Sequence, residues 1–253
     1  MRLRILLSSC AVWLCASPAA ALVIGGSSLA YAERVELTAL LLNIDSGPQP
    51  EASGSAPAPY SASDELLSIS LGSGTISSGT LVVNAASDVD GAPGARSASA
   101  DATVESLQIG GALSTLVSLS SSTVGSSAQV AGNGALSASG DAVLEDLAIS
   151  VLGVPLSIPA SPAPNTVLWN AGGILIVLNE QILSGAGSSG LALVVNALRI
   201  EFANAALGLG LLNGEIVIAR SEAALAAVPE PSVALLVLTV ASLLAGLGRR
   251  PGA

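Results

Sequence analysis

Carboxylates are the main reactive side chains in this 253-residue sequence. Glycoside hydrolysis requires only a pair of carboxyl groups at a defined separation, so acidic residues alone are sufficient for that reaction. Glu105 and Glu145 occupy equivalent positions in two similar segments, and Glu180 follows an apolar run. However, aromatic residues, which form the stacking platforms of glycosidases, make up only 2% of the chain. A glycosidase-like enzyme is therefore the third of three hypotheses, and no catalytic residue is predicted.

Two other groups of polar residues are candidates for a site, and for both a structural role is the favoured interpretation. Asp88 and Asp90 stand before a turn glycine and resemble a fragment of a calcium-binding loop. The remaining ligands of such a loop are missing, so both residues are weak calcium candidates, an acidic turn is the favoured interpretation, and neither a metal site nor a cofactor is predicted. Asn179 and Gln181 flank Glu180, and we expect their side chains to satisfy backbone groups in a turn at a strand end.

Composition excludes most other chemistry. The chain has no histidine and no lysine, and both of its cysteines, Cys10 and Cys15, lie close to the N-terminus. If that stretch is a cleaved leader, the mature protein lacks Ser-His-Asp and Cys-His nucleophiles, Schiff-base lysines, His/Cys zinc sites, iron–sulfur clusters and disulfides. The net charge of −10 argues against a nucleic-acid partner, because a phosphate backbone requires a basic surface.

The N-terminal residues have the layout of a secretory signal peptide. Arg2 and Arg4 precede an apolar stretch, which is followed by small residues that fit a cleavage site. We predict a signal peptide within residues 1–32, with cleavage after Ala21 or Ala32 and a slight preference for the first. A retained N-terminal anchor and lipidation at the first cysteine are the alternatives.

The other end of the chain is predicted to lie in a membrane. Residues 232–248 form a 17-residue run without charges, which is at the lower limit for a membrane-spanning helix. Arg249 and Arg250 follow at once, as expected for a stop-transfer segment whose positive end stays in the cytoplasm. Residues 223–228 are expected to be a linker to this segment.

A three-residue motif, Pro229-Glu230-Pro231, stands immediately before the apolar run. The order of this motif, a short apolar helix and terminal arginines resembles the PEP-CTERM sorting signal of Gram-negative bacteria, over residues 229–253. The resemblance implies recognition by an exosortase in the inner membrane, cleavage near the motif, and delivery to the cell surface or extracellular matrix. Such proteins typically accompany exopolysaccharide production. A plain C-terminal anchor is the alternative.

The middle of the chain has the pattern of an all-β protein. Turn residues recur about every ten positions, which is typical of many short strands. Apolar and polar residues alternate along 97–104, and the apolar phase then shifts, which predicts a bulge or bend near Glu105 and Ser106. Half-polar strands favour antiparallel pairing. We therefore predict an antiparallel β-sandwich domain at 33–222, with a β-solenoid as the alternative.

Several segments of this domain have a specific expectation. Further strands are expected at 34–44, 80–86, 166–169, 173–179, 191–202 and 214–220. The Pro/Gly/Ser-rich segment 46–60 is predicted to be a mobile loop. Trp169 is expected to anchor the core or a loop. Residues 97–109 match 137–149 at eight of thirteen positions, with a weaker copy from Tyr60, so both duplication and a chance match of low-complexity sequence remain open.

A second resemblance covers residues 30–222. It is carried by four ordered blocks, SPAPNT (161–166), VLNEQ (177–181), LVVNALRI (193–200) and GEIVIARS (214–221). These blocks resemble the choice-of-anchor P family, which implies a secreted all-β protein that occurs with different C-terminal anchors. Arg199 stands where such proteins commonly carry histidine, and LWNAGGI (168–174) replaces a more usual Leu-Pro-Gly turn. The family implies no active site that can be transferred to this chain.

Together these features predict an exported bacterial protein with a leader, one acidic all-β extracellular domain and a sorting tail. We expect it to be anchored in the inner membrane before processing and to reach the cell surface or the matrix afterwards. Its predicted role is a non-enzymatic structural or interaction component associated with exopolysaccharide. A carbohydrate- or calcium-dependent binding module is the alternative. The expected partners are exosortase, transiently the inner membrane, and exopolysaccharide, with no nucleic acid.

Overall fold

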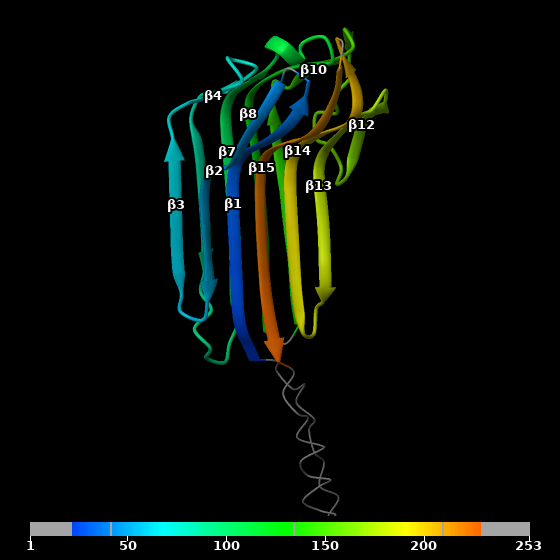
Figure 1. Ribbon diagram of the computed structural model, residues 1–253. Helices are drawn as coiled ribbons and strands as arrows, with labels where there is room; N and C mark the ends of the chain where they lie inside the picture. Colours follow the sequence, from blue (N-terminus) through cyan, green and yellow to red (C-terminus); the bar gives the residue numbers. More distant parts are fainter. Residues whose placement is uncertain (1–21, 41, 134, 209, 229–253) are drawn as a thin grey trace, which may run out of the picture.

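The computed structural model describes residues 22–40, 42–133, 135–208 and 210–228, and most of them lie in β-strands (Figure 1). The strands are β1 (Leu22–Ala39), β2 (Leu42–Ala56), β3 (Tyr60–Leu66), β4 (Ile69–Leu71), β5 (Ile76–Ser78), β6 (Leu81–Ser87), β7 (Arg96–Ile109), β8 (Val117–Asn133), β9 (Ala135–Glu145), β10 (Ala148–Val151), β11 (Val154–Pro155), β12 (Thr166–Ala171), β13 (Ile174–Ala186), β14 (Gly190–Leu207) and β15 (Gly210–Val228). A single turn of 3₁₀ helix, Gly111–Leu113, follows β7.

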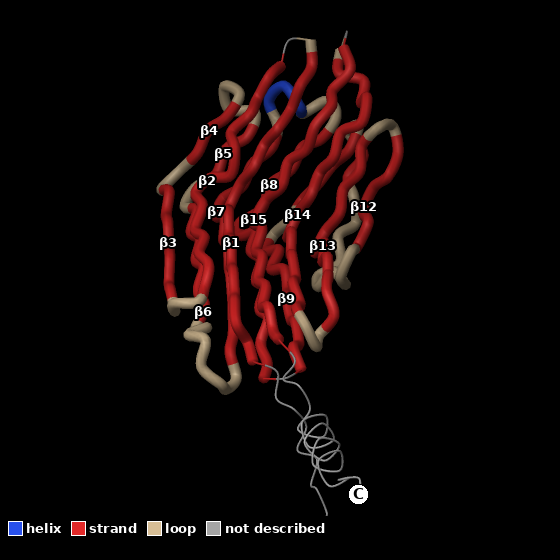
Figure 2. Tube along the Cα trace, turned by 60° about the horizontal axis from the view of Figure 1, so that its bottom comes forward, coloured by secondary structure: helices blue, strands red, loops and turns tan. Residues whose placement is uncertain are grey.

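The strands form two sheets that pack against each other. Sheet A has the order β12-β13-β14-β15-β1-β2. Sheet B has the order β11-β10-β8-β7-β5-β4, and it continues through β6 and β3 beside β7 and through β9 beside β8. The pairings between described strands are antiparallel, and the long strands of both sheets run along the same axis (Figure 2). The predicted antiparallel sandwich is confirmed, and the solenoid alternative is wrong because the strands do not form stacked parallel rungs.

Small aliphatic side chains fill the space between the sheets. Inward and outward residues alternate along β6, β7, β14 and β15, as expected for strands with one buried face. The largest fully buried side chains are Leu37, Ile76, Leu81, Leu107, Ile109, Leu113, Ile174, Ile176, Leu178, Leu198, Ile200 and Leu212. Trp169 is partly buried and packs against this core, which confirms its expected role as an anchor.

The two ends of the described chain lie side by side. β1 pairs with β15 along its whole length, and the first pair joins Leu22 to Val228. Residues 223–228, predicted as a linker, are instead the last part of β15, where the alternate side chains Ala223, Leu225 and Ala227 are buried. Residues 22–32, which fall in the predicted signal peptide if cleavage follows Ala32, belong to β1.

The prediction of a mobile loop at 46–60 is wrong. Most of this segment forms β2, which pairs with β1 at the edge of sheet A. Proline lacks the amide hydrogen that a central strand needs, but an edge strand leaves one side of its backbone unpaired and tolerates proline there. Pro48 and Pro50 both lie in this edge strand. Segment 46–60 therefore has the composition of a loop, although most of it forms a strand.

The predicted irregularity near Glu105 is confirmed. Glu105 and Ser106 are both exposed between buried neighbours, and Ser106 has a φ of +53°. The second copy of the repeated sequence has the same feature, since Asp146 has a φ of +50°. The two copies flank β8 on opposite sides, because the same residues of β8 pair with β7 on one edge and with β9 or β10 on the other. The repeat thus corresponds to two similarly bent strands around a common neighbour.

The two copies differ where the sheets approach each other. Ala100 of the first copy corresponds to Gly140 of the second, which lies in β9. A Cβ atom on Gly140 would lie 2.5 Å from Cγ2 of Val195 and 2.9 Å from Cδ2 of Leu193, both on β14. Contacts this short do not occur between real side chains, so the glycine permits β9 to pack closely against sheet A.

Gly140→Ala is expected to lower the free energy of unfolding by about 1–3 kcal/mol, because the added methyl group overpacks the interface between β9 and β14. Chemical denaturation measures this change. Gly125→Ala is the matched control in β8, since its Cβ would have no neighbour closer than 3.5 Å. Equal stability of the two variants would show that the close approach at Gly140 is not a packing constraint.

Candidate functional site

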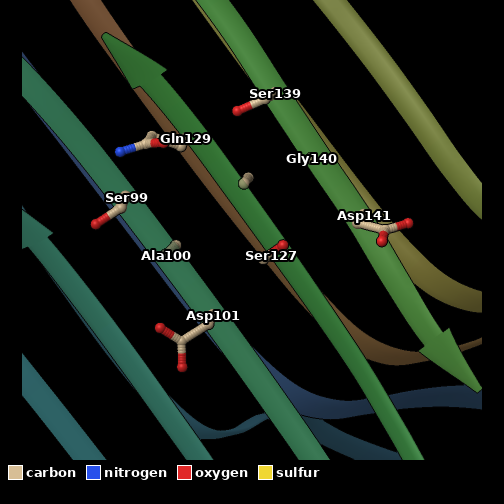
Figure 3. Close-up of a pocket in the computed structure, with 9 residues that line it drawn as sticks. Ser99, Ala100, Asp101, Ser127, Gln129, Ser139, Gly140 and Asp141 are labelled. Carbon is tan, nitrogen blue, oxygen red and sulfur yellow. The ribbon is translucent and has the colours of Figure 1, made fainter.

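The outer face of sheet B carries a shallow polar hollow. In the strand register, Asp101 of β7 and Asp141 of β9 both lie opposite Ser127 of β8. Directly opposed residues of antiparallel strands point to the same side of a sheet, so these side chains share one surface. The hollow, lined by Ser99, Ala100, Asp101, Ser127, Ala128, Gln129, Ser139, Gly140 and Asp141, has a volume of about 400 Å³ (Figure 3).

The polar hollow offers hydrogen-bonding groups rather than an assembled catalytic pair. Asp101 and Asp141 are separated by two strand spacings, or roughly 10 Å between Cα atoms. The side chain of Asn84 donates a hydrogen bond of 2.8 Å to Asp101, and the carboxylate of Asp141 accepts one of 2.9 Å from the Ala142 amide. Carboxylates, hydroxyls and an amide in one open hollow are groups that can bind the hydroxyls of a saccharide.

The three glutamates considered for glycoside hydrolysis are not brought together. Glu105 and Glu145 lie opposite Thr123 from its two sides and are exposed on the outer face of sheet B. Glu180 is in β13 of sheet A. Glu180 is therefore separated from Glu105 and Glu145 by the thickness of the sandwich, and Glu105 and Glu145 lie on an open surface.

The calcium candidates Asp88 and Asp90 already have partners. The carboxylate of Asp88 accepts a hydrogen bond from the Ser97 amide, and that of Asp90 accepts one of 2.8 Å from the Ala92 amide. Arg96 forms an ion pair of 2.6 Å with Asp90. The hydrogen bond from Ala92, assisted by Arg96, lowers the pKa of Asp90. These contacts fit the acidic-turn interpretation, with an arginine as the local cation.

Within the described ranges, no group of three or more His, Cys, Asp or Glu residues is placed to hold a metal ion.

Glu180 takes part in an ion-pair network on the outer face of sheet A. Arg199 contacts Glu180 at 3.3 Å, Glu201 at 2.6 Å and Glu215 at 3.3 Å. The Asn196 side chain donates a further hydrogen bond of 2.6 Å to Glu180. One arginine thus joins carboxylates of β13, β14 and β15, and the planar guanidinium suits this role because it presents donors in several directions.

The expectation that the side chains of Asn179 and Gln181 satisfy backbone groups is confirmed. The side-chain amide of Asn179 donates to the Pro162 carbonyl, and the side-chain amide of Gln181 donates to the Gly140 carbonyl, each at 3.0 Å. Their position differs from the expectation, because both residues lie inside β13 rather than at its end. Asn179 has a φ of +50°, so the backbone is irregular at this residue although β13 continues beyond it.

A second hollow, of about 530 Å³, lies near the end of the sandwich remote from the Leu22–Val228 pair. Its lining is Ala39, Leu40, Ala112, Thr115, Leu116, Leu152, Ala206, Leu207, Gly208 and Gly210. None of these lining residues is charged, and Leu40 and Leu152 are strongly exposed. This surface suits an apolar group and has no chemistry for an ionic ligand.

Sequence reasoning missed the most unusual titratable group. Glu33 is fully buried, and neither of its carboxylate oxygens has a hydrogen-bond partner in the described structure. Its neighbours across the sheet are Ile218 of β15 and Gln49 of β2. Burial raises the pKa of Glu33 from 4.5 to about 7. A single charged residue in a half-polar strand carries no signal that its side chain points inward.

The predicted terminal elements lie outside the described residues. These elements are the signal peptide up to Ala21, the sorting motif Pro229-Glu230-Pro231, the apolar helix 232–248, and Arg249 and Arg250. In the part of the chain that is described, no helix has the length and apolar character needed to cross a membrane. A scan against protein-family models found no match, and a search of curated proteins found none either.

The buried carboxyl of Glu33 makes the fold sensitive to pH. Between about pH 4.5 and 7 the folded protein retains a proton that the unfolded chain releases, so the free energy of unfolding is expected to fall as the pH rises through this range. The full shift corresponds to about 3 kcal/mol.

Glu33→Gln removes this titration, and its stability is expected to vary much less over the same range. Urea unfolding at several pH values provides the measurement, with Glu36→Gln, at an exposed position of the same strand, as the control. Parallel pH profiles for the wild type and Glu33→Gln would contradict the assignment.

Proposed function

We propose that this chain is an exported bacterial protein of the cell surface or extracellular matrix, with a non-enzymatic structural or interaction role associated with exopolysaccharide. The observation that carries the proposal is the pairing of Leu22 with Val228. It brings the attachment points of the proposed leader and of the proposed sorting tail to the same end of the sandwich (Figure 1). A domain held at one end presents its outer faces and its far end to its surroundings.

The chain ends also favour one cleavage site for the proposed signal peptide. Cleavage after Ala21 leaves β1 complete. Cleavage after Ala32 would remove the residues that pair with β15 from Leu22 to Tyr31. The unpaired half of β15 would then expose backbone groups in the middle of sheet A, which is costly. We therefore propose the earlier site.

The second resemblance gains support from the arrangement of its four blocks. Asn165, from the first block, donates its backbone amide to the Asn179 carbonyl of the second. Arg199, from the third block, pairs with Glu180 of the second and Glu215 of the fourth. Blocks that are separated in the sequence thus form one contact network on sheet A. This supports the proposal that the domain is of the choice-of-anchor P type.

The proposed sorting is tested by the intact mass of the protein from its native host, compared with a strain that lacks exosortase. We expect loss of residues 1–21 in both strains and loss of the segment after Pro231 only when exosortase is present. A mass that retains 232–253 in both strains would make the protein a membrane-anchored one and remove the main support for a matrix role.

A second candidate function, a saccharide-binding module, is favoured by the polar hollow. Calorimetric titration with purified matrix polysaccharide, with and without calcium, should give binding heat that the double variant Asp101→Asn/Asp141→Asn reduces several-fold, because amides hydrogen-bond sugar hydroxyls less strongly than carboxylates do. Asp64→Asn, on β3 of the same sheet, is the control. Absence of heat in every titration would reject this candidate.

A further inference from the structure

The lower half of β13 is an open edge of sheet A. β12 pairs with β13 only as far as the Thr166–Leu178 pair, whereas β13 continues to Ala186 with β14 on its other side. No other described strand pairs with this part of β13, which lies at the rim of the molecule below β12 (Figure 1). We call residues 182–186 the open edge. Ile182 and Leu183 are 50% and 62% exposed in it.

The direction of the backbone groups along the open edge follows from one contact. The backbone amide of Gln181 donates a hydrogen bond to the side-chain carbonyl oxygen of Asn165, so it points away from β14. In an antiparallel ladder, alternate residues direct both backbone groups to the same neighbour. Leu183, two residues later, therefore presents its amide and carbonyl outward. Asn165 occupies the position beyond Gln181, which leaves Leu183 as the centre of the available edge.

The other strand edges carry features that prevent pairing with another chain. β2 contains Pro48 and Pro50, and β3 contains Asp64 and Glu65. β4 and β11 are very short, and β12 is interrupted by a bulge. The free side of β9 is partly used, since the Leu136 amide and the Gly140 carbonyl already bind Gly187 and Gln181. Proline, charge, short length and bulges are the usual protections of sheet edges. The open edge contains neither proline nor charge, and no register shift interrupts its pairing with β14.

The charge of the open edge indicates what can pair with it. From Gln181 to Leu198 the chain has no charged residue, although its net charge is −10. Two acidic copies repel each other over most of their surface, and this neutral segment is a place where they can approach without direct repulsion. An antiparallel ladder is also compatible with two-fold symmetry, because both strands then use the same groups.

We propose that the open edge binds the open edge of a second copy of this chain, as antiparallel strands with the two Leu183 residues opposite each other. Each Leu183 then donates its amide to the carbonyl of the other, and Ile182 of each copy lies beside Ser184 of its partner. The ladder is limited to Ile182, Leu183 and Ser184 of each copy, because Asn165 occupies the position beside Gln181 that Gly185 of the second copy would otherwise take. The contact falls below the roughly 1,200 Å² of a stable complex, so the pairing is weak and is best detected by covalent trapping.

The register makes a specific cross-linking test available. The full chain is prepared with Cys10→Ser and Cys15→Ser, which removes both native cysteines. One preparation then carries Ile182→Cys and a second, with a different tag, carries Ser184→Cys. In detergent micelles, where copies can turn relative to each other, mild oxidation of the mixture should give a disulfide dimer that contains both tags. Neither preparation alone should form it efficiently, because each new thiol then faces an unsubstituted residue.

Two further variants distinguish specific pairing of the open edges from random collision of the thiols. Leu183→Lys in both preparations places like charges opposite each other and should abolish the mixed dimer. Leu211→Lys, at a similarly exposed leucine of β15 away from the open edge, should leave it unchanged. Equal cross-linking of the mixture and the separate preparations, no cross-linking at all, or a disulfide to a different protein in cell extracts in place of the mixed dimer would each overturn the proposal.

Discussion

The pairing of the first strand with the last is the contact on which the rest of the architecture depends. β1 and β15 are neighbours inside sheet A and stay paired from Leu22–Val228 to Thr38–Asn213. The whole of sheet B lies between them in the sequence, so their pairing closes a loop that comprises almost all of the described chain. Without it, sheet A would divide between β1 and β15, and both parts would expose the apolar face that now covers sheet B.

The two outer faces of the sandwich differ in how their charges are neutralised. With lysine absent, arginine is the only basic side chain, and Arg34, Arg199 and Arg220 all form ion pairs on sheet A. On sheet B, Asp101 and Asp141 have no arginine partner among the described residues. Asp101 and Asp141 are therefore carboxylates that remain free to meet a ligand, whereas Glu180 and Glu215 of sheet A join neighbouring strands through arginine.

The local sequence pattern predicted features that depend on neighbouring residues in the chain. It failed for features that depend on contacts between strands distant in the sequence. The shift at Ser106 was visible because alternation along one strand reveals which face is buried. The segment 46–60 was misjudged because proline is excluded from central strands but not from edges, and edge position is a property of the whole sheet. The ion pairs of Arg199 and the burial of Glu33 depend on register across three strands, which no single segment encodes.

The proposed pairing of two copies has a consequence for where it can occur. Antiparallel contact at the open edge turns the second copy end over end, so the ends at which the two chains would be tethered point in opposite directions. The open edge also lies near the tethered end, because Gly190, just beyond it, pairs with Ala226. Two copies held closely on one membrane would each direct their partner's body into that membrane. The pairing is therefore compatible with copies released from the membrane, and sorting and assembly would follow each other in that order.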